Sequence, residues 1–371
     1  MEKHSDALII GGGVIGLASA YYLAKAGHKV RLLEQTTIGA GASLGNCGLI
    51  VTSHLIPLCA PGAIWHETQR WLQGRSPLYI KLAPDKKRFL WLLNFALKCN
   101  REHLAHAIKT NSLLKPYGNY AVPVIGDELY RLEPALRKGL YGAWHHKSDG
   151  HLRPDKLMHA WQRVLTAQGV AVQENCRLKS LIDGEGQVRG ARTAGGTYTA
   201  DAYVLSTGAW TPQLTGQLKL DLPVQPGKGY SLTMRRPETC PQMPCYFYER
   251  SVVATPWKSG FRLGGTMEFS GFNSEIFARR IQNLTAAAAQ YLKTPLGNPV
   301  MEEWVGMRPM VYDDLPIIDR APEHHNLVVA TGHGMSGISM ATSTGKLVAE
   351  MVTGRKPHID LTAFSIRRFN G

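Results

Sequence analysis

The chain has 371 residues, of which 44% are apolar and 19% are charged, with 38 glycines and 21 prolines. This composition excludes a coiled coil and a disordered chain, and the length exceeds the size at which one hydrophobic core keeps growing, so we expect two domains. The formal net charge of +14 favours an anionic partner, and we weight a membrane surface above nucleic acid because the basic residues are dispersed.

The cysteines and the N-terminus indicate the compartment. Six cysteines are scattered through the chain without a CxxC pair, which fits neither a zinc site nor a disulfide framework. The start has no basic n-region and no long apolar stretch like those of a signal peptide. We therefore expect reduced thiols, no metal site and a cytoplasmic location, either free or peripheral on the inner face of the cytoplasmic membrane; the oligomeric state stays open.

In chain order, the opening predicts a βαβ unit with a strand at 7–10, a helix at 14–26 and a strand at 29–33. Residues 64–141 change to helical pieces rich in Leu, Lys and His, which we interpret as an excursion into a second domain. The later elements are a helix at 153–168, strands at 170–173 and 202–206, strands at 230–235, 251–255 and 261–265, a helix at 274–292, a strand at 326–330 and a helix at 338–353.

This order predicts an α/β fold with a discontinuous Rossmann-like first domain, built on a parallel sheet, and an α+β second domain with a mainly antiparallel sheet. The predicted first domain comprises residues 1–63, 143–223 and 308–371, and the second comprises 64–142 and 224–307.

The first turn carries a phosphate-binding pattern. Gly11-Gly-Gly13-Val-Ile-Gly16 matches GxGxxG between a strand and a helix, and Glu34 ends the next strand 23 residues after Gly11. Gly11 permits the tight turn, Gly13 lets the backbone approach a pyrophosphate, and Gly16 lets helix and strand pack closely. Glu34 is placed to accept both ribose hydroxyls. The pattern predicts a dinucleotide site and does not separate NAD from FAD.

Two further segments favour a flavin. The run of small residues at 39–48 offers backbone N–H groups and the Ser43 hydroxyl to a cofactor that continues beyond the adenosine. The run Gly332-His-Gly334-Met-Ser-Gly337 lies between a strand and a helix, so a second helix N-terminus is directed at negative charge. In a flavin, the N1–C2=O edge becomes anionic on reduction.

With these segments the chain resembles the FAD-dependent D-amino-acid dehydrogenase group, within the larger family of D-amino-acid oxidase, glycine oxidase and sarcosine oxidase. The resemblance covers nearly the whole length: the opening at 6–34, the loop at 41–61, the strand at 202–210 and the closing segment at 306–346. It implies that the first domain binds FAD and the second shapes the substrate site. The FAD is expected to be noncovalent, because covalent attachment through cysteine uses a late segment and this chain has no cysteine after Cys245.

The resemblance also implies site residues. Arg308, in Gly-Met-Arg-Pro, matches the arginine whose planar fork holds the substrate carboxylate. His54, Tyr248 and Tyr312 are further catalytic candidates, each with an ordinary structural alternative as a loop-ordering or core side chain. His333 is expected to pack against the flavin or hydrogen-bond rather than act as a base. The expected FAD residues are Gly11, Gly13, Val14, Ile15, Gly16, Glu34, Gln35, Ala42, Ser43, Asn46, Gly48, Leu49, Thr207, Gly208, Trp210, Gly332, His333, Gly334, Met335, Ser336, Gly337 and Ile338.

Two segments leave alternatives open. The stretch between Ser112 and Glu133 is shorter than in relatives, so either a loop was lost or a piece is missing from the sequence. The apolar run at 89–97 is flanked by basic residues and falls short of the ~20 residues of a spanning helix. It is either an interfacial amphipathic helix or an ordinary helix packed on the second domain.

The expected reaction is oxidative deamination of amino acids, most readily D-amino acids, to 2-oxo acids and ammonia, with electrons passed to a respiratory quinone or another acceptor. The alternatives are a glycine, sarcosine or imino-acid oxidase or dehydrogenase, including a cyanide-releasing type, and an RNA-modifying flavoprotein. The volume of the substrate pocket would distinguish the first alternative from the expected enzyme. An affinity for tRNA that falls steeply with salt concentration would indicate the second.

Overall fold

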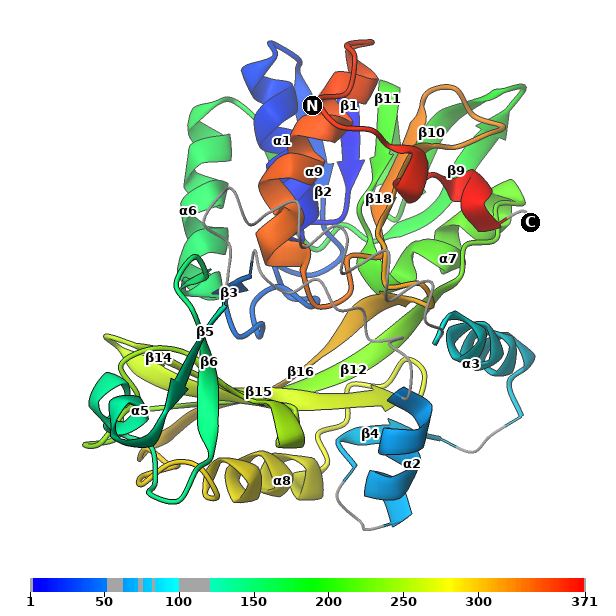
Figure 1. The fold of residues 1–371 in the computed structure, drawn as a ribbon. Coiled ribbons are helices and arrows are strands. Elements are labelled where there is room, and N and C mark those ends of the chain that lie inside the picture. Colours follow the sequence, from blue (N-terminus) through cyan, green and yellow to red (C-terminus); the bar gives the residue numbers. More distant parts are fainter. Residues whose placement is uncertain (1–2, 52–62, 73–75, 82–83, 100–120, 370–371) are drawn as a thin grey trace. The chain divides into compact units, whose positions relative to one another are not determined.

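The computed structural model describes residues 3–51, 63–72, 76–81, 84–99 and 121–369 (Figure 1). The chain divides into two compact units, each made of separate stretches. The first unit comprises Met1–Leu44, Asp155–Pro226 and Met307–Gly371, and the second comprises Gly45–Pro154 and Gly227–Gly306.

The unit boundaries differ from the expected domain boundaries at residues 45–51 and 143–154, which group with the second unit, and at 224–226 and 307, which group with the first. The reason is local pairing within that unit. Strand β3 (Leu49–Ile50) pairs with β7 (Gly150–His151), and the Leu152 N–H donates to the Gly48 carbonyl at 2.8 Å. Such backbone pairing between segments distant in sequence leaves no periodic signal in either segment.

The first unit is built on a sheet in the order β17-β18-β11-β1-β2-β8. All neighbouring pairs are parallel except β17 with β18. Strands β9 and β10 extend β11 as an antiparallel branch. The bounds are β1 His4–Ile10, β2 Val30–Leu33, β8 Ala171–Gln173, β9 Leu178–Gly184, β10 Gln187–Thr193, β11 Gly196–Leu205, β17 Ile317–Arg320 and β18 Leu327–Thr331.

Helices α1 (Val14–Lys25) and α9 (Gly337–Val352) lie side by side in the first unit (Figure 1). Their contact is close because Gly345 has no side chain: a Cβ there would lie 2.5 Å from the Ala18 carbonyl carbon. Helix α6 (Pro154–Ala167) and the short α7 (Thr211–Thr215) complete the helices that the structure describes in this unit. A parallel sheet with helices against it is the expected Rossmann-like arrangement.

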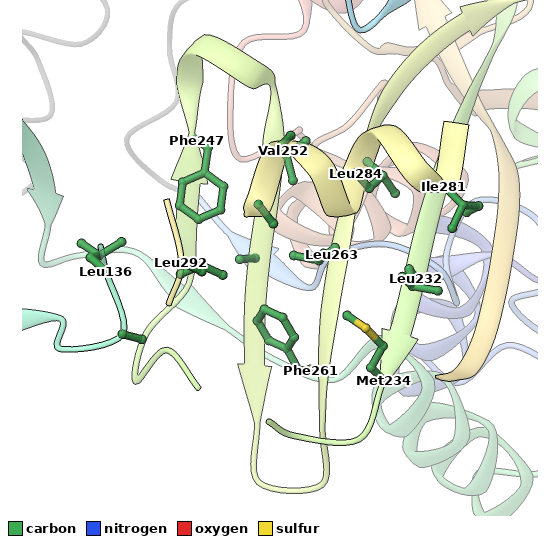
Figure 2. Packing of buried hydrophobic residues seen from close by; sticks show 14 of the residues in the cluster. Leu136, Leu232, Met234, Phe247, Val252, Phe261, Leu263, Ile281, Leu284 and Leu292 are labelled. Atoms are coloured by element: carbon green, nitrogen blue, oxygen red, sulfur yellow. The ribbon is translucent and has the colours of Figure 1, made fainter. Parts of the chain in front are cut away.

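The second unit is built on a sheet in the order β13-β14-β15-β12-β16, with β4 added in parallel to β15. The bounds are β4 Leu78–Ile80, β12 Val224–Met234, β13 Cys245–Phe247, β14 Val252–Trp257, β15 Gly260–Phe269 and β16 Val300–Val311. Helix α8 (Ala278–Ala288) covers one face through Ile281 and Leu284, which pack on Leu232, Leu263 and Val252 (Figure 2). The mainly antiparallel sheet agrees with the expected α+β class.

The expected helical excursion at 64–141 is wrong in part, because it also contains strands. Beside helices α2 (Ala63–Leu72), α3 (Lys86–Lys98) and α5 (Gly126–Leu132), β5 (Ala121–Ile125) pairs antiparallel with β6 (Gly142–His146). Within the shortened stretch at 112–133, residues 112–120 lie outside the part of the chain that the structure describes. None of the helices in the described part of the chain is long and apolar enough to cross a membrane.

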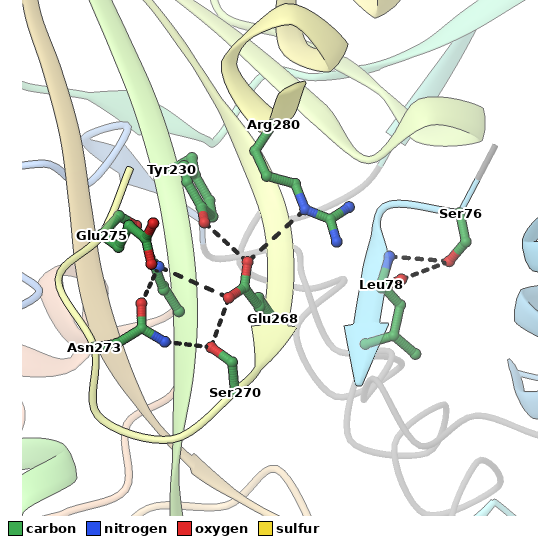
Figure 3. A network of polar contacts seen from close by, with 9 residues as sticks. Ser76, Leu78, Tyr230, Glu268, Ser270, Asn273, Glu275 and Arg280 are labelled. Atoms are coloured by element: carbon green, nitrogen blue, oxygen red, sulfur yellow. Dashed lines mark hydrogen bonds and ion pairs between the residues drawn. The ribbon is translucent and has the colours of Figure 1, made fainter. Parts of the chain in front are cut away.

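A buried polar network in the second unit explains why α8 begins later than the expected residue 274 (Figure 3). Lys228 and Glu268 are fully buried with Nζ and Oε1 3.7 Å apart. Glu268 also accepts from Tyr230 at 2.8 Å, and Lys228 donates to the Glu275 carbonyl. The Glu275 carbonyl thus accepts a hydrogen bond from the lysine side chain, and the helix begins only at Ala278. Burial lowers the pKa of Lys228, and Glu268 opposes that shift.

Candidate active site

Most of the expected cofactor residues lie in the segments where the parallel strands of the first unit end. Strands β1, β2, β11 and β18 finish at Ile10, Leu33, Leu205 and Thr331, and the segments after them carry the glycine turn, Glu34, residues 207–210 and residues 332–334. The carboxyl edge of an open parallel sheet is where such folds bind ligands.

The glycine turn is shaped by backbone contacts. Gly11 has φ +110°, and a Cβ there would lie 2.5 Å from the Ser206 carbonyl oxygen. Gly16 packs directly on the Gly11 carbonyl and the Ser206 hydroxyl. Gly13 differs, because a Cβ would meet only the Ser43 hydroxyl, at 3.4 Å. Space therefore lies in front of Gly13, at the N-terminus of α1, where an approaching anion would be stabilised by the helix dipole.

Two polar side chains hold this turn. Glu34 is nearly buried at the end of β2, and its Oε2 accepts the Gly12 N–H at 2.7 Å while Oε1 accepts the Thr36 N–H at 3.0 Å. Oε1 also accepts the Thr36 hydroxyl at 3.2 Å. Each carboxylate oxygen has two lone pairs, so the contacts of the described residues leave one of them, on Oε2, for a ribose hydroxyl. The Ser43 hydroxyl accepts the Val14 N–H at 3.0 Å. The expected residues Gln35 and Ala42 lie beside these two, in the same segments.

The segment after β11 is tied to the end of β18. Thr331 donates to the Gly208 carbonyl at 2.9 Å, and Thr211 donates to Thr331 at 3.1 Å. Trp210 lies near the small-residue run, since a Cβ at Gly41 would be 3.7 Å from its ring. Thr207, Gly208 and Trp210 are thereby held at the same edge as the glycine turn.

The late loop places a second helix N-terminus beside the first. Gly332 and Gly334 have φ of +76° and +51°, which favours glycine at both positions. Ser336 is the N-cap residue of α9, with Met335 before it and Ile338 inside the first turn. A Cβ at Gly337 would lie 3.8 Å from a Val14 methyl group, so the starts of α9 and α1 are adjacent.

His333 is buried in this loop, and its Nε2 lies 3.0 Å from the Thr344 hydroxyl. Burial lowers the pKa of His333 to about 3. The imidazole is therefore neutral at physiological pH and a weak base, and its expected packing against the flavin stays a prediction.

Strand β16 brings Arg308 next to the late loop. Gly334 donates its N–H to the carbonyl of Pro309, the residue after Arg308, at 3.0 Å. Arg308 is half-buried, and Tyr312 follows the end of the strand, in edge contact with Phe369 at 5.5 Å between ring centroids. Burial raises the pKa of Tyr312, so its hydroxyl stays protonated.

The comparison with known families decides the assignment. The family described as FAD dependent oxidoreductase matches residues 6–351. The chain belongs to this family.

Curated relatives match almost the entire chain. It is 29% identical over 421 aligned positions to a D-amino acid dehydrogenase of Xanthobacter autotrophicus, covering 98% of both chains. It is 30% identical over 423 positions to a D-amino acid dehydrogenase of Methylobacterium sp. (strain 4-46), covering 98% of both. Both alignments are longer than the 371 residues here, so these relatives contain residues that this chain lacks.

Among solved structures, the fold is similar to that of glycine oxidase from Geobacillus kaustophilus. The TM-score is 0.77, with 24% identity and 99% of each chain covered. This agreement extends to the combination of a Rossmann-like unit and a separate antiparallel sheet.

The residues of the first unit fit FAD. The space at Gly13, the N-terminus of α1 and the Glu34 carboxylate at the end of β2 match a pyrophosphate and an adenosine ribose. The neighbouring start of α9 supplies a second set of backbone N–H groups suited to the pyrimidine edge of a flavin.

Four expected site residues group elsewhere. Asn46, Gly48 and Leu49 belong to the second unit. Tyr248 begins a 3-10 helix of that unit, Tyr248–Arg250, and is 68% exposed, in edge contact with Tyr246. His54 lies outside the described residues.

Several residues that shape the site were missed. Ser206 donates to the Gly11 carbonyl at 3.1 Å beneath the glycine turn. The hydroxyls of Thr211, Thr331 and Thr344 hydrogen-bond to groups of the loops after β11 and β18. Small hydroxyl residues of this kind carry no pattern of their own. Arg262 is different: it is a charged residue within the alternating strand Gly-Phe-Arg-Leu-Gly, and a charge at an inward position is a recognisable signal.

Proposed function

We propose that the protein oxidatively deaminates amino acids, with D-amino acids as the preferred class, to 2-oxo acids and ammonia. The first unit is the FAD-binding domain, and the second is the substrate domain. Support comes from the curated relatives named D-amino acid dehydrogenase at 29–30% identity over nearly the whole chain.

When bound, FAD would supply, at its N5, the acceptor for a hydride from the substrate Cα. The protein's part is binding and orientation. Arg308 holds the carboxylate in two parallel hydrogen bonds, which fixes the face of Cα that is presented. The amine must be unprotonated. His333, whose pKa burial lowers to about 3, brings no cation that would compete for the carboxylate, and Tyr312, whose pKa burial raises, brings no anion that would compete for Arg308. Water then hydrolyses the imine to the oxo acid and ammonia.

One observation carries this proposal: the Gly334 N–H to Pro309 carbonyl bond, 3.0 Å long, joins the late glycine loop to the strand residue beside Arg308. The bond thus joins the proposed carboxylate anchor to the proposed flavin-facing helix start within the first unit.

The proposed electron acceptor is a membrane quinone rather than O2, supported by the basic surface and the dehydrogenase-like relatives. Glycine, sarcosine and cyclic imino acids remain the alternative substrates. A screen of these compounds and of D- and L-amino acids, with a dye acceptor and with O2, separates the possibilities.

Arg308 provides the direct test. Arg308→Ala is expected to lose about 30- to several-thousand-fold in kcat/KM, on the order of 2–5 kcal/mol, while FAD stays bound. Arg308→Lys should recover only part, because an ammonium makes a point contact where the fork makes two. Steady-state kinetics and the flavin absorption of each purified variant measure both effects.

The matched control is Arg192→Ala, which removes an exposed arginine of the first unit, on β10. It should keep native kinetics. If Arg308→Ala oxidised D-amino acids at the native rate, the carboxylate anchor would lie elsewhere and the proposed function of this strand would be wrong.

A further inference from the structure

Each residue of the short segment Gly45–Gly48 packs on or hydrogen-bonds to other residues of the second unit. Gly45 packs flat against the Trp304 ring, and the Cys47 thiol occupies the space over Gly264; a side chain at either glycine would overlap its neighbour. Asn46 Oδ1 accepts the Gly48 N–H at 2.7 Å, which stabilises the left-handed turn at Gly48, where φ is +74°.

Arg262, on strand β15, is the charged residue at the centre of this arrangement, and it is 4% exposed. Its Nη1 donates to the Asn46 carbonyl at 2.8 Å, its Nε to Thr233 Oγ1 at 2.8 Å and its Nη2 to Glu302 Oε2 at 3.0 Å. The guanidinium also lies 5.1 Å from the centroid of the Trp257 ring. All these partners belong to the second unit.

A buried guanidinium is costly unless its donors are satisfied. Its carboxylate partner, Glu302, has a side chain that is 45% exposed, so solvent screens the ion pair and leaves it a weak reason to bury a charge. The rigid guanidinium donates from one nitrogen to the Asn46 carbonyl, while its other two nitrogens bond to side chains of the sheet. The geometry is that of a side chain holding a loop in place.

The held segment continues directly into the proposed flavin loop. The chain passes from the first unit to the second between Leu44 and Gly45. On the near side, Ser43 is fixed by the Val14 N–H at the start of α1; on the far side, Asn46 is fixed by Arg262. The run of small residues is therefore anchored at both ends by different elements.

We propose that Arg262 is a positioning residue for FAD: through the Asn46 carbonyl it holds the Gly45–Gly48 segment in the conformation that receives the cofactor. This inference rests on the proposed assignment of Asn46, Gly48 and Leu49 to FAD binding. Arg262 acts through the loop and does not itself touch the cofactor.

The test compares FAD affinity of apoprotein variants by titration of flavin fluorescence. Arg262→Met keeps the length and apolar stem but removes the three donors, and it is expected to raise the FAD Kd by about tenfold or more, as loss of a charge-assisted hydrogen bond implies. Arg262→Lys should fall between wild type and Arg262→Met, because one donor can still reach the Asn46 carbonyl. The flavin absorption band should also broaden in Arg262→Met as the ring environment loosens.

A readout without FAD follows the loop itself. Cys47 is half-buried and in no disulfide, so its alkylation rate, measured by peptide mass spectrometry on apoprotein, should increase in Arg262→Met. The matched control is Arg280→Met. Arg280 also pairs with a buried carboxylate of the second unit, Glu268 at 3.8 Å, and among the described residues the other contact of its guanidinium is with the Tyr79 ring, 4.8 Å from the centroid, rather than with residues 45–48.

The outcomes separate the two proposals. If wild-type protein binds no FAD, the proposed function fails. If wild type binds FAD while Arg262→Met keeps the native Kd and the native Cys47 alkylation rate, the positioning role is wrong. If Arg262→Met and Arg280→Met weaken FAD binding equally, the effect is general destabilisation, and the inference is again overturned. Should Arg262→Met prove insoluble, Arg262→Lys decides by the same two measurements.

Discussion

At the scale of single residues, burial determines whether a titratable side chain of the first unit carries a charge. His333 is the sharpest case, because desolvation brings its pKa to about 3 while its ring is 5% exposed. A buried neutral histidine makes folding depend on pH, since the unfolded chain takes up a proton that the folded chain refuses.

The sign of this dependence gives a prediction. Between pH about 6.5 and about 3 the unfolded state binds more protons at this position, so the unfolding free energy falls as pH falls, by up to about 1.4 kcal/mol per pH unit. His333→Gln keeps a hydrogen-bonding side chain and removes the titration. Relative to wild type, the variant should gain on the order of 2 kcal/mol between about pH 6.5 and pH 5, measured by urea unfolding at both pH values.

The control for this prediction is His159→Gln, at an exposed position of helix α6 in the same unit. The difference between wild type and this control should not change over that pH range. A His333→Gln variant whose stability parallels wild type at both pH values would contradict a neutral, buried His333.

At the scale of elements, the sequence predicted the parts whose signal is local. The turn glycines, Glu34 and the α1 start follow from a motif with a backbone reason for each position, and Gly11 with φ +110° fulfils it. Strands β5 and β6 were missed because each is stabilised by the other rather than by its own periodicity. Helix α8 was overextended at its start because Glu275 contacts a distant lysine, Lys228.

The contact between α1 and α9 could not be predicted from the sequence either. Gly345 lies in the interior of an expected helix, where glycine costs about 1 kcal/mol relative to alanine. The structure supplies the compensation, because a Cβ at Gly345 would lie 2.5 Å from the Ala18 carbonyl carbon and 2.8 Å from the Ala18 methyl carbon. Close helix approach, rather than helix propensity, explains the glycine.

Gly345→Ala is therefore expected to destabilise the protein, by about 1–3 kcal/mol, even though alanine is the better helix former. It should also weaken FAD binding, because the starts of α1 and α9 move apart. Gly216→Ala is the control: Gly216 has φ −59° and a Cβ there would meet nothing within 4 Å, so a neutral or slightly stabilising change is expected. Urea unfolding of both variants checks the pair; equal stability would show that the helices can separate at no cost.

At the scale of the whole molecule, the net charge of +14 and the exposed apolar side chains of α3 point to the same partner. Helix α3 turns Trp91 inward against Phe269, with ring centroids 4.9 Å apart. Its outer side shows Phe89 at 65%, Leu93 at 45% and Leu97 at 66% exposed. The helix is thus packed and amphipathic at once, so the two interpretations of residues 89–97 are compatible.

Binding to an anionic bilayer is the last prediction. The exposed lysines at both ends of α3, Lys86, Lys87 and Lys98, would attract acidic headgroups while Phe89 and Leu97 enter the interface. Wild-type protein should float with anionic vesicles at low salt and be released at high salt, as screening requires. The double variant Phe89→Ser with Leu97→Ser should bind about tenfold more weakly or worse, because two interfacial apolar side chains are lost. Tyr141→Ser, at a fully exposed aromatic position, should bind like wild type. Flotation that is equal for zwitterionic and anionic vesicles, or unchanged in the double variant, would remove α3 as the membrane contact and with it the structural reason for preferring a membrane quinone over O2.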